Sequence, residues 1–291
     1  MKTIRILFFV PLILILVSWC FTLISKISGI EKNYYMLVLF QQVLAIFLPT
    51  YLYYKRKDKS PYLKKKDLSF NNFEDTLIFI LLGICLQFIG SLANFPIVSF
   101  FAKFGIYSTA PMMQINSFWD FILSVLILCL LPSIFEEVLF RKFIYDDLRQ
   151  YSKNTAIFFS ALFFSFAHMN FYNISSLFII GLVLGIMRAR NFPLIHLMLC
   201  HFFINFTGLM LTIVSKYPNY QYFFDNHYVL LLAVFAFIVL LILKKTANPP
   251  EQFEFNYYKR PTLEFLKSIY KIPVTYIYLA VFITMGIINL F

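Results

Sequence analysis

The sequence predicts an all-α membrane protein: a polytopic transmembrane helical bundle with about eight or nine spans and a cytoplasmic N-terminus. Of its 291 residues, 60% are hydrophobic and only 13% are charged, against about 25% charged residues in an average soluble chain. The apolar residues form runs of about 17–25, the length that crosses roughly 30 Å of hydrocarbon as a helix. The mean hydropathy of +0.76 excludes an ordinary soluble domain.

Nine segments are candidate spans, and each is expected to be helical because hydrocarbon offers no water to pair with backbone polar groups. They are residues 4–24, 34–54, 74–95, 118–140, 155–170, 173–190, 192–215, 228–243 and 273–291. The fifth, sixth and last are short for a span. The first is expected to stay uncleaved, because no small-residue cleavage site interrupts it.

The distribution of positive charge predicts the orientation. With a cytoplasmic N-terminus, 21 of the 25 Lys and Arg residues fall in cytoplasmic segments, and the outside keeps only Lys26, Lys32, Lys103 and Lys216. This asymmetry follows the positive-inside rule. The net charge is +11, and the basic residues lie between the apolar spans. The expected partners of these residues are therefore the anionic lipids of the bilayer, and nucleic acid is not expected to bind.

The chain is expected to divide into three regions. Residues 1–115 would hold N-terminal transmembrane helices and a solvated basic loop at 55–72. Residues 116–245 would form a membrane core, and residues 246–291 a cytoplasmic linker with a possible extra span. All four cysteines lie in apolar segments and predict no disulfide framework.

Two adjacent glutamates interrupt the fourth apolar span, in the sequence LILCLLPSIFEEVLFRKF. An ionisable group at such depth costs a few kcal/mol and marks a functional site by default. On a helix, Glu137 and Arg141 are i and i+4 and can pair on one face. Glu136 lies about 100° away and is expected to be the reactive carboxylate. Pro132 either kinks this helix and opens a wet cavity or is simply tolerated.

Polar residues also mark two later spans. His168 closes the fifth, and His201 and Asn205 share one face of the seventh at i, i+4 spacing. Taken singly, each fits a polar contact between helices. A glutamate, two histidines and an asparagine on three spans together indicate a shared site.

The order and spacing of these residues resemble the CPBP (Abi) family of intramembrane proteases, which includes the type II CAAX prenyl endopeptidase and bacteriocin-processing relatives. Glu136 to Arg141 matches the motif EExxxR, Phe164 to His168 matches FxxxH, and His201 to Asn205 matches HxxxN. The resemblance covers roughly residues 118–215. It implies a catalytic core in which Glu136 and His168 activate a water. His201 and Asn205 would then donate hydrogen bonds to an oxyanion, and Glu137 and Arg141 would hold the motif helix.

The implied activity is hydrolysis of a peptide bond in a membrane-associated peptide or protein. The expected location is a bacterial plasma membrane, because richness in Phe, Ile, Lys, Asn and Tyr is typical of proteins from AT-rich bacterial genomes. No cofactor is expected. Zinc is the alternative, because Glu and His can ligate it, but the HExxH pattern is absent. His196 lies about 140° around the helix from His201 and fits the membrane interface better than a ligand set.

Two other classes of function stay open. One is a non-catalytic bacteriocin-immunity or scaffolding membrane protein on the same fold. The other is a proton-coupled transporter that uses the buried carboxylate, although the sequence shows no inverted repeat of the kind such transporters carry.

The span assignments contain a geometric conflict. They put Glu136 near the cytoplasmic edge of its span and His168 near the opposite end of the next. Shared chemistry requires an approach within about 3 Å, or one intervening water. Strongly tilted helices, a dip of segment 143–153 into the membrane, or a span boundary displaced by several residues would each resolve the conflict.

Overall fold

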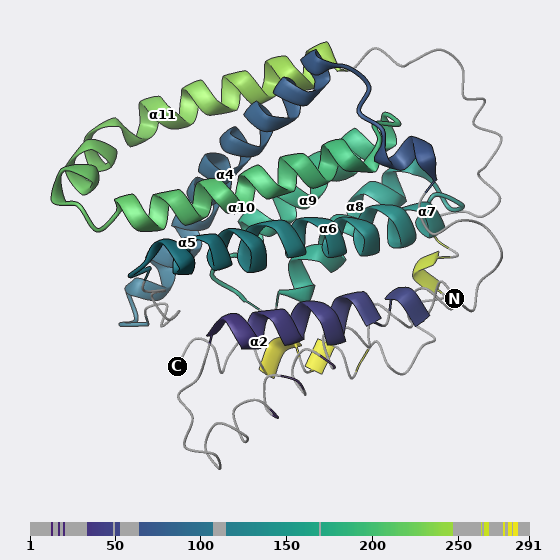
Figure 1. Cartoon of the computed structure of the whole chain (residues 1–291), viewed down its shortest axis with the longest axis horizontal. Helices are drawn as coiled ribbons and strands as arrows, with labels where there is room; N and C mark the ends of the chain where they lie inside the picture. The colour runs from purple at the N-terminus through teal and green to yellow at the C-terminus, as the bar shows by residue number, and fades with distance from the viewer. Residues whose placement is uncertain are drawn as a thin grey trace.

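The computed structural model describes residues 34–48, 50–52, 64–106, 115–168 and 170–246, with isolated positions in 13–20 and 263–284. Every regular element in these ranges is a helix and none is a strand (Figure 1), which confirms the all-α prediction for them. The predicted spans at 4–24 and 273–291 and most of the linker after residue 246 lie outside the described residues. All four cysteines are free, as predicted.

The described helices follow one another closely along the chain. They are α2 (Tyr34–Phe40), the π-helical η1 (Gln41–Phe47), the short η2 (Lys65–Leu68), α4 (Phe73–Ala102), α5 (Phe118–Ser124), the π-helical η3 (Val125–Leu130), α6 (Leu131–Glu137), the π-helical η4 (Val138–Ile144), α7 (Tyr145–Leu148), α8 (Lys153–Ala167), α9 (Ile174–Ala189), α10 (Leu194–Val214) and α11 (Pro218–Lys245). Within the part of the chain that the structure describes, four stretches are long and apolar enough to cross a membrane: Tyr35–Leu52, Phe73–Ala102, Phe118–Leu148 and Leu194–Val214. The total of eight or nine spans and the orientation of the N-terminus stay predictions.

Polar caps fix where the apolar helices begin. The Asn72 side chain accepts a hydrogen bond from the backbone N–H of Asp75 at the start of α4. Ser152 does the same for Thr155 at the start of α8, at 2.9 Å. Such caps satisfy backbone N–H groups that a helix leaves unpaired at its first turn. They separate α8 sharply from the helix before it.

The helix that carries the glutamate pair is longer than the sequence predicted. It runs from Phe118 to Leu148, eight residues beyond the predicted end of the span at residue 140. Charged residues after that point suggested a loop, but Lys142 and Asp146 form ion pairs and remain helical. Pro132 lies just after π-helical η3, whose wider turn accommodates a residue that lacks a backbone N–H.

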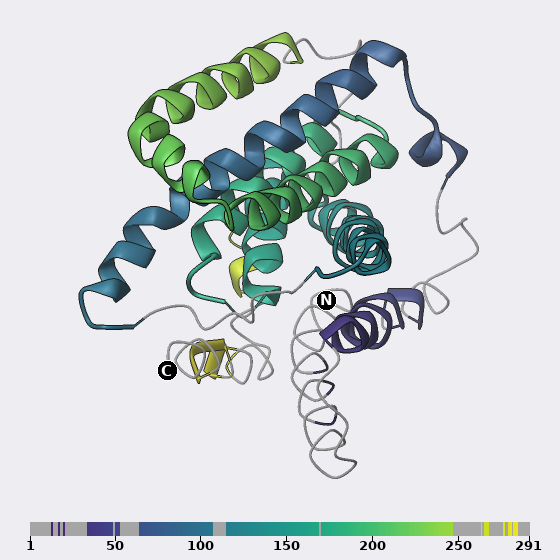
Figure 2. The same ribbon diagram turned by 60° about the vertical axis from the view of Figure 1, so that its left-hand side comes forward.

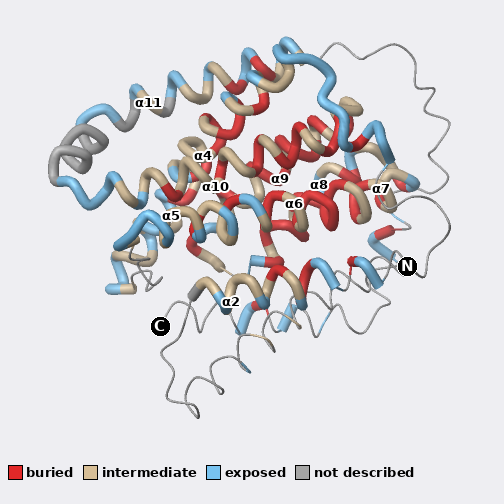
Figure 3. The backbone as a smooth tube through the Cα atoms, in the orientation of Figure 1, coloured by how far each residue is buried: buried red, intermediate tan, exposed pale blue. Residues whose placement is uncertain are grey.

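Close helix contacts build the core around α8, α9 and α10. Figure 3 shows buried residues concentrated on these helices and on α6, whereas α11 and α2 are mainly intermediate or exposed. At Gly181 of α9, an added Cβ would lie 2.9 Å from the Cα of Ala161 on α8. The two helices therefore touch along their backbones. Figure 2 shows α2 and η1 running beside the α5–α7 helix at the edge of the bundle.

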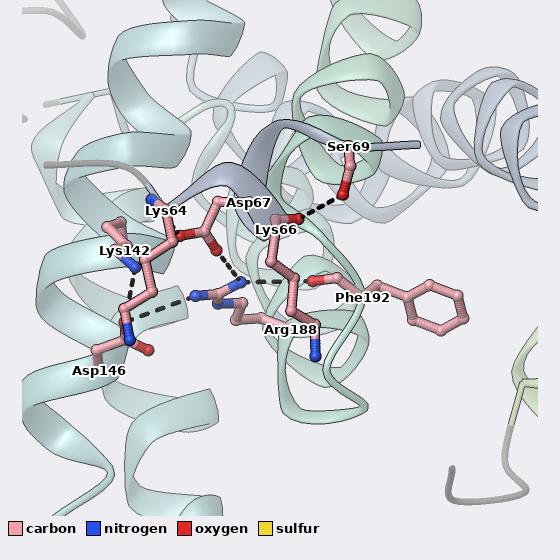
Figure 4. A network of polar contacts seen from close by, with 8 residues as sticks. All are labelled: Lys64, Lys66, Asp67, Ser69, Lys142, Asp146, Arg188 and Phe192. Atoms are coloured by element: carbon pink, nitrogen blue, oxygen red, sulfur yellow. Dashed lines mark hydrogen bonds and ion pairs between the residues drawn. The ribbon is translucent and has the colours of Figure 1, made fainter. Parts of the chain in front are cut away.

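The described end of the basic loop at 55–72 is exposed, as predicted for a solvated connector, except at Asp67, which ties it to the helices. Residues 55–63 lie outside the described residues, but Asp67 is buried and binds Lys142 Nζ at 2.8 Å and Arg188 at 3.2 Å (Figure 4). Asp146 pairs with the same two cations, at 3.8 and 3.6 Å. Burial alone would raise the pKa of Asp67, but the Lys142 hydrogen bond and the charges of Arg188 and Lys142 outweigh it and hold that pKa below its usual value. The loop end is therefore clamped onto η4, α7 and α9.

Candidate active site

Glu136 lies at the centre of a buried polar cluster. Its side chain is 6% exposed. One oxygen, Oε1, accepts a hydrogen bond of 2.9 Å from Nε2 of Gln42. The other oxygen, Oε2, has no hydrogen bond within the described ranges, and it lies 3.7 Å from Nε2 of His168 and 4.0 Å from Nε2 of His201. The structure thus brings three of the four predicted catalytic side chains together.

A helical hairpin with arms of equal length explains how Glu136 meets His168. Each residue stands sixteen positions from Ser152, which begins the second arm. The first arm, η4 and α7, packs against the second arm, α8, so residues at the same separation from the turn come to similar levels. The hairpin thus brings Glu136 and His168 together, and the position of segment 143–153 relative to the membrane stays a prediction.

The His168 ring is oriented by a backbone carbonyl, so that Nε2 faces Glu136. Its Nδ1 lies 2.8 Å from the backbone carbonyl of Phe164. A carbonyl oxygen only accepts, so Nδ1 carries the proton. In the neutral ring Nε2 is then an acceptor. The His168 side chain is 33% exposed, whereas that of His201 is 4% exposed.

His201 is oriented by the second glutamate of the pair. Its Nδ1 lies 2.8 Å from Oε1 of Glu137, and this directs Nε2 toward Glu136. An ionised carboxylate is only an acceptor, so the ring donates from Nδ1. His201 can therefore donate from Nε2 as well only when it is an imidazolium. The sequence could not reveal this contact, because the residues come from different helices.

The histidines of the cluster pack on a second layer of side chains, formed by Glu137, Arg141 and Phe164. The predicted i, i+4 ion pair is present: Arg141 Nε lies 3.3 Å from Glu137 Oε2, and both side chains are fully buried. The guanidinium sits 4.6 Å from the ring centre of Phe164, a cation–π contact. The same ring packs against His168 and His201, with centroids 4.9 and 5.7 Å apart. Phe164 therefore supports both imidazoles and the ion pair.

The fourth predicted catalytic residue, Asn205, is not in hydrogen-bond contact with the cluster in the part of the chain that the structure describes. It lies one turn after His201 on α10 and is half-buried. Within the described ranges it makes no hydrogen bond to Glu136, His168 or His201, so its part in an oxyanion site stays a prediction.

The sequence analysis did not identify Gln42 as a site residue. The polar pair Gln41–Gln42 in an otherwise apolar span is nevertheless the kind of signal that marks interhelical polar contacts.

His196 is enclosed by aromatic side chains, and its place at the membrane interface stays a prediction. It is fully buried, with the rings of Phe70 and Phe79 5.3 and 5.2 Å away. The reason is the clamped loop end, which places Phe70 over it.

The residues that come nearest to a metal-ligand set are Glu136, His168 and His201. Across the described ranges, however, no group of three or more His, Cys, Asp or Glu side chains has the arrangement of a metal site.

Glu136 and His201 lie on helices apolar enough to cross a membrane, and His168 lies at the end of the shorter apolar helix α8. A buried carboxylate beside two imidazoles on such helices defines a membrane protein whose site suits acid–base chemistry on water. Residues 118–207 match the family model described as Type II CAAX prenyl endopeptidase Rce1-like. This confirms the resemblance drawn from the motifs, and the 90 matched residues, of 291, contain all three of them. The matched family is one of proteases. No curated protein and no solved structure matches the chain.

Proposed function

We propose that this protein is an intramembrane endopeptidase that hydrolyses a peptide bond in a membrane-associated peptide or protein. The observation that carries the proposal is the free oxygen of Glu136, which faces Nε2 of both His168 and His201 at 3.7 and 4.0 Å. The match of residues 118–207 to a protease family supports it. The proposed location is a bacterial plasma membrane, with anionic lipids around the cytoplasmic basic residues.

The distances favour a water as the nucleophile. Separations of 3.7 and 4.0 Å exceed a direct hydrogen bond and suit one water between the groups. Glu136 Oε2 would take one proton of that water while the lone pair of His168 Nε2 orients the other. The water oxygen then adds to the carbonyl carbon of the scissile bond. General base catalysis of this kind contributes about 10²–10⁴-fold in rate.

The remaining groups complete the reaction. His201, as an imidazolium, and Asn205 would donate to the oxyanion of the tetrahedral intermediate, and each such donor contributes about 3–4 kcal/mol. The C–N bond then breaks as Glu136 returns its proton to the leaving amine. A new carboxyl group and a free amine result, and Glu136 is again a carboxylate. These steps require no cofactor.

Comparative proteomics of the membrane fraction tests the proposal. Cells that carry Glu136→Gln should accumulate an uncleaved membrane peptide or protein that wild-type cells process. Glu74→Gln is the matched control, because Glu74 is exposed and pairs with Lys245 away from the site. The identified substrate is then incubated with purified protein in proteoliposomes. Full cleavage by Glu136→Gln or by His201→Ala would overturn the proposal. Biological protection that survives Glu136→Gln would indicate an immunity or scaffolding role.

A further inference from the structure

Gln42 is a buried amide with an unusual position. It lies in π-helical η1, inside the apolar stretch Tyr35–Leu52, and it is 8% exposed. Its Nε2 donates 2.9 Å to Glu136 Oε1. Its own Oε1 is buried and makes no hydrogen bond within the described ranges. An amide in hydrocarbon costs a few kcal/mol when it is not fully paired, so the contact to Glu136 calls for a reason beyond packing.

The helix that carries Gln42 is docked by other contacts. At one end, Tyr35 Oη lies 3.0 Å from Ser124 Oγ and donates 3.2 Å to the backbone carbonyl of Asp120. Toward the other end, the ring of Phe47 lies 5.1 Å from that of Phe135, the residue before Glu136. Gln42 stands between these two anchors. Its hydrogen bond is therefore one of several contacts of this helix with the α5–α7 helix.

The hydrogen bond distinguishes the two oxygens of Glu136. Oε1 is held by the amide N–H, whereas Oε2 is the oxygen that faces both imidazoles. A carboxylate that is tied at one oxygen cannot rotate its other oxygen away from the histidines without losing that bond. Small displacements of a catalytic group, of about 1 Å, can cost on the order of 10²-fold in rate.

We propose that Gln42 is a positioning residue for the reaction: its amide fixes Glu136 Oε1 and aims Glu136 Oε2 at the attacking water. The proposal rests on the proposed function. It adds a residue from outside the matched segment 118–207, so the candidate site is assembled from the matched region and from the helix that precedes it in the chain.

Gln42→Met tests the proposal, because methionine keeps the length and volume of the side chain and removes the donor. The expected result is a fall in kcat of about 10- to 100-fold with KM within about twofold, in proteoliposomes with the identified substrate. Two controls accompany it. Tyr35→Phe weakens an anchor of the same helix without touching Glu136, and Gln87→Met makes the same chemical change on α4. Both should keep kcat within about twofold.

An infrared measurement keeps this test separate from the proposed function. The carboxyl and carboxylate bands of Glu136 are assigned by their loss in Glu136→Gln. They should shift in Gln42→Met and stay in place in Gln87→Met, whether or not a substrate is cleaved. Unchanged bands in Gln42→Met would overturn the positioning role. Equal losses of kcat in Gln42→Met and Tyr35→Phe would overturn it too, because they would show a helix-docking contact only.

Discussion

His201 Nδ1 lies 2.8 Å from Glu137 Oε1, so the second glutamate of the pair holds the imidazole that faces the first. Its other oxygen is 3.3 Å from Arg141 Nε. One carboxylate thus joins a cation on its own helix to a histidine on α10. The two neighbouring glutamates consequently have different surroundings, with Glu137 enclosed by two basic groups and Glu136 by an amide and two imidazole nitrogens.

Removing Arg141 should be strongly destabilising. Arg141→Met leaves the fully buried Glu137 without its cation, and breaking a buried pair in this way costs about 3–5 kcal/mol. Arg141→Lys keeps the charge but loses the flat guanidinium that stacks on Phe164, so it should lie between Met and wild type. Thermal unfolding in detergent measures both. Wild-type stability of Arg141→Met would contradict the expectation.

The close contact of α8 and α9 should not tolerate a methyl group. In Gly181→Ala the new Cβ would lie 2.9 Å from the Ala161 Cα, so the helices must separate. We expect a loss of about 1–3 kcal/mol of stability. Gly185→Ala is the matched control one turn away, where the nearest atoms, on Ile157, are 3.4 Å from the new Cβ. Equal stability of the two variants would show that the backbone contact is not limiting.

The clamp at Asp67 should be sensitive to acid. At neutral pH, Asp67→Asn should lose about 1–3 kcal/mol, because charged hydrogen bonds to Lys142 and Arg188 are removed. The folded pKa lies below the usual 3.8. The wild-type advantage is therefore complete above about 3.8 and disappears as pH falls through the folded pKa. Unfolding by denaturant at several pH values measures the difference, and a gap that widens on acidification would contradict this sign.

Chelation distinguishes the metal-free mechanism from a zinc mechanism. We expect cleavage in proteoliposomes to stay within about twofold after treatment with 1,10-phenanthroline, since the steps proposed for Glu136 and His168 use a water and no Lewis acid. A zinc mechanism predicts loss of activity and its recovery on addition of Zn²⁺. Recovery of this kind would overturn the metal-free mechanism but not the assignment of a protease.

Sequence patterns predicted the helical class, the main apolar helices and the Glu137–Arg141 pair. These depend on local properties: apolar run length and i, i+4 spacing act within one helix. The motifs also identified Glu136, His168 and His201, and in the structure the Nε2 atoms of both histidines lie 3.7 and 4.0 Å from Glu136 Oε2.

Contacts between helices could not be predicted in this way. The Gln42–Glu136 bond spans 94 positions, and the His201–Glu137 bond spans 64. Charged residues misled the prediction of a helix end, because Lys142 and Asp146 are paired across elements rather than solvated. The burial of His196 was also not predictable, because its neighbour Phe70 comes from a loop that is distant in the sequence.

The side chains of the candidate site differ in solvent exposure, so the cluster has one accessible side and one enclosed side. Glu136, Gln42 and His201 are almost fully enclosed, whereas a third of the His168 side chain is accessible at the end of α8. Among Glu136, Gln42, His168 and His201, the His168 side chain is therefore the one that a polypeptide can contact most directly. In the proposed reaction the scissile bond enters as an uncoiled stretch, because a helical substrate keeps its carbonyl groups hydrogen-bonded to its own backbone. The enclosed site would thus select substrates by how readily they unwind.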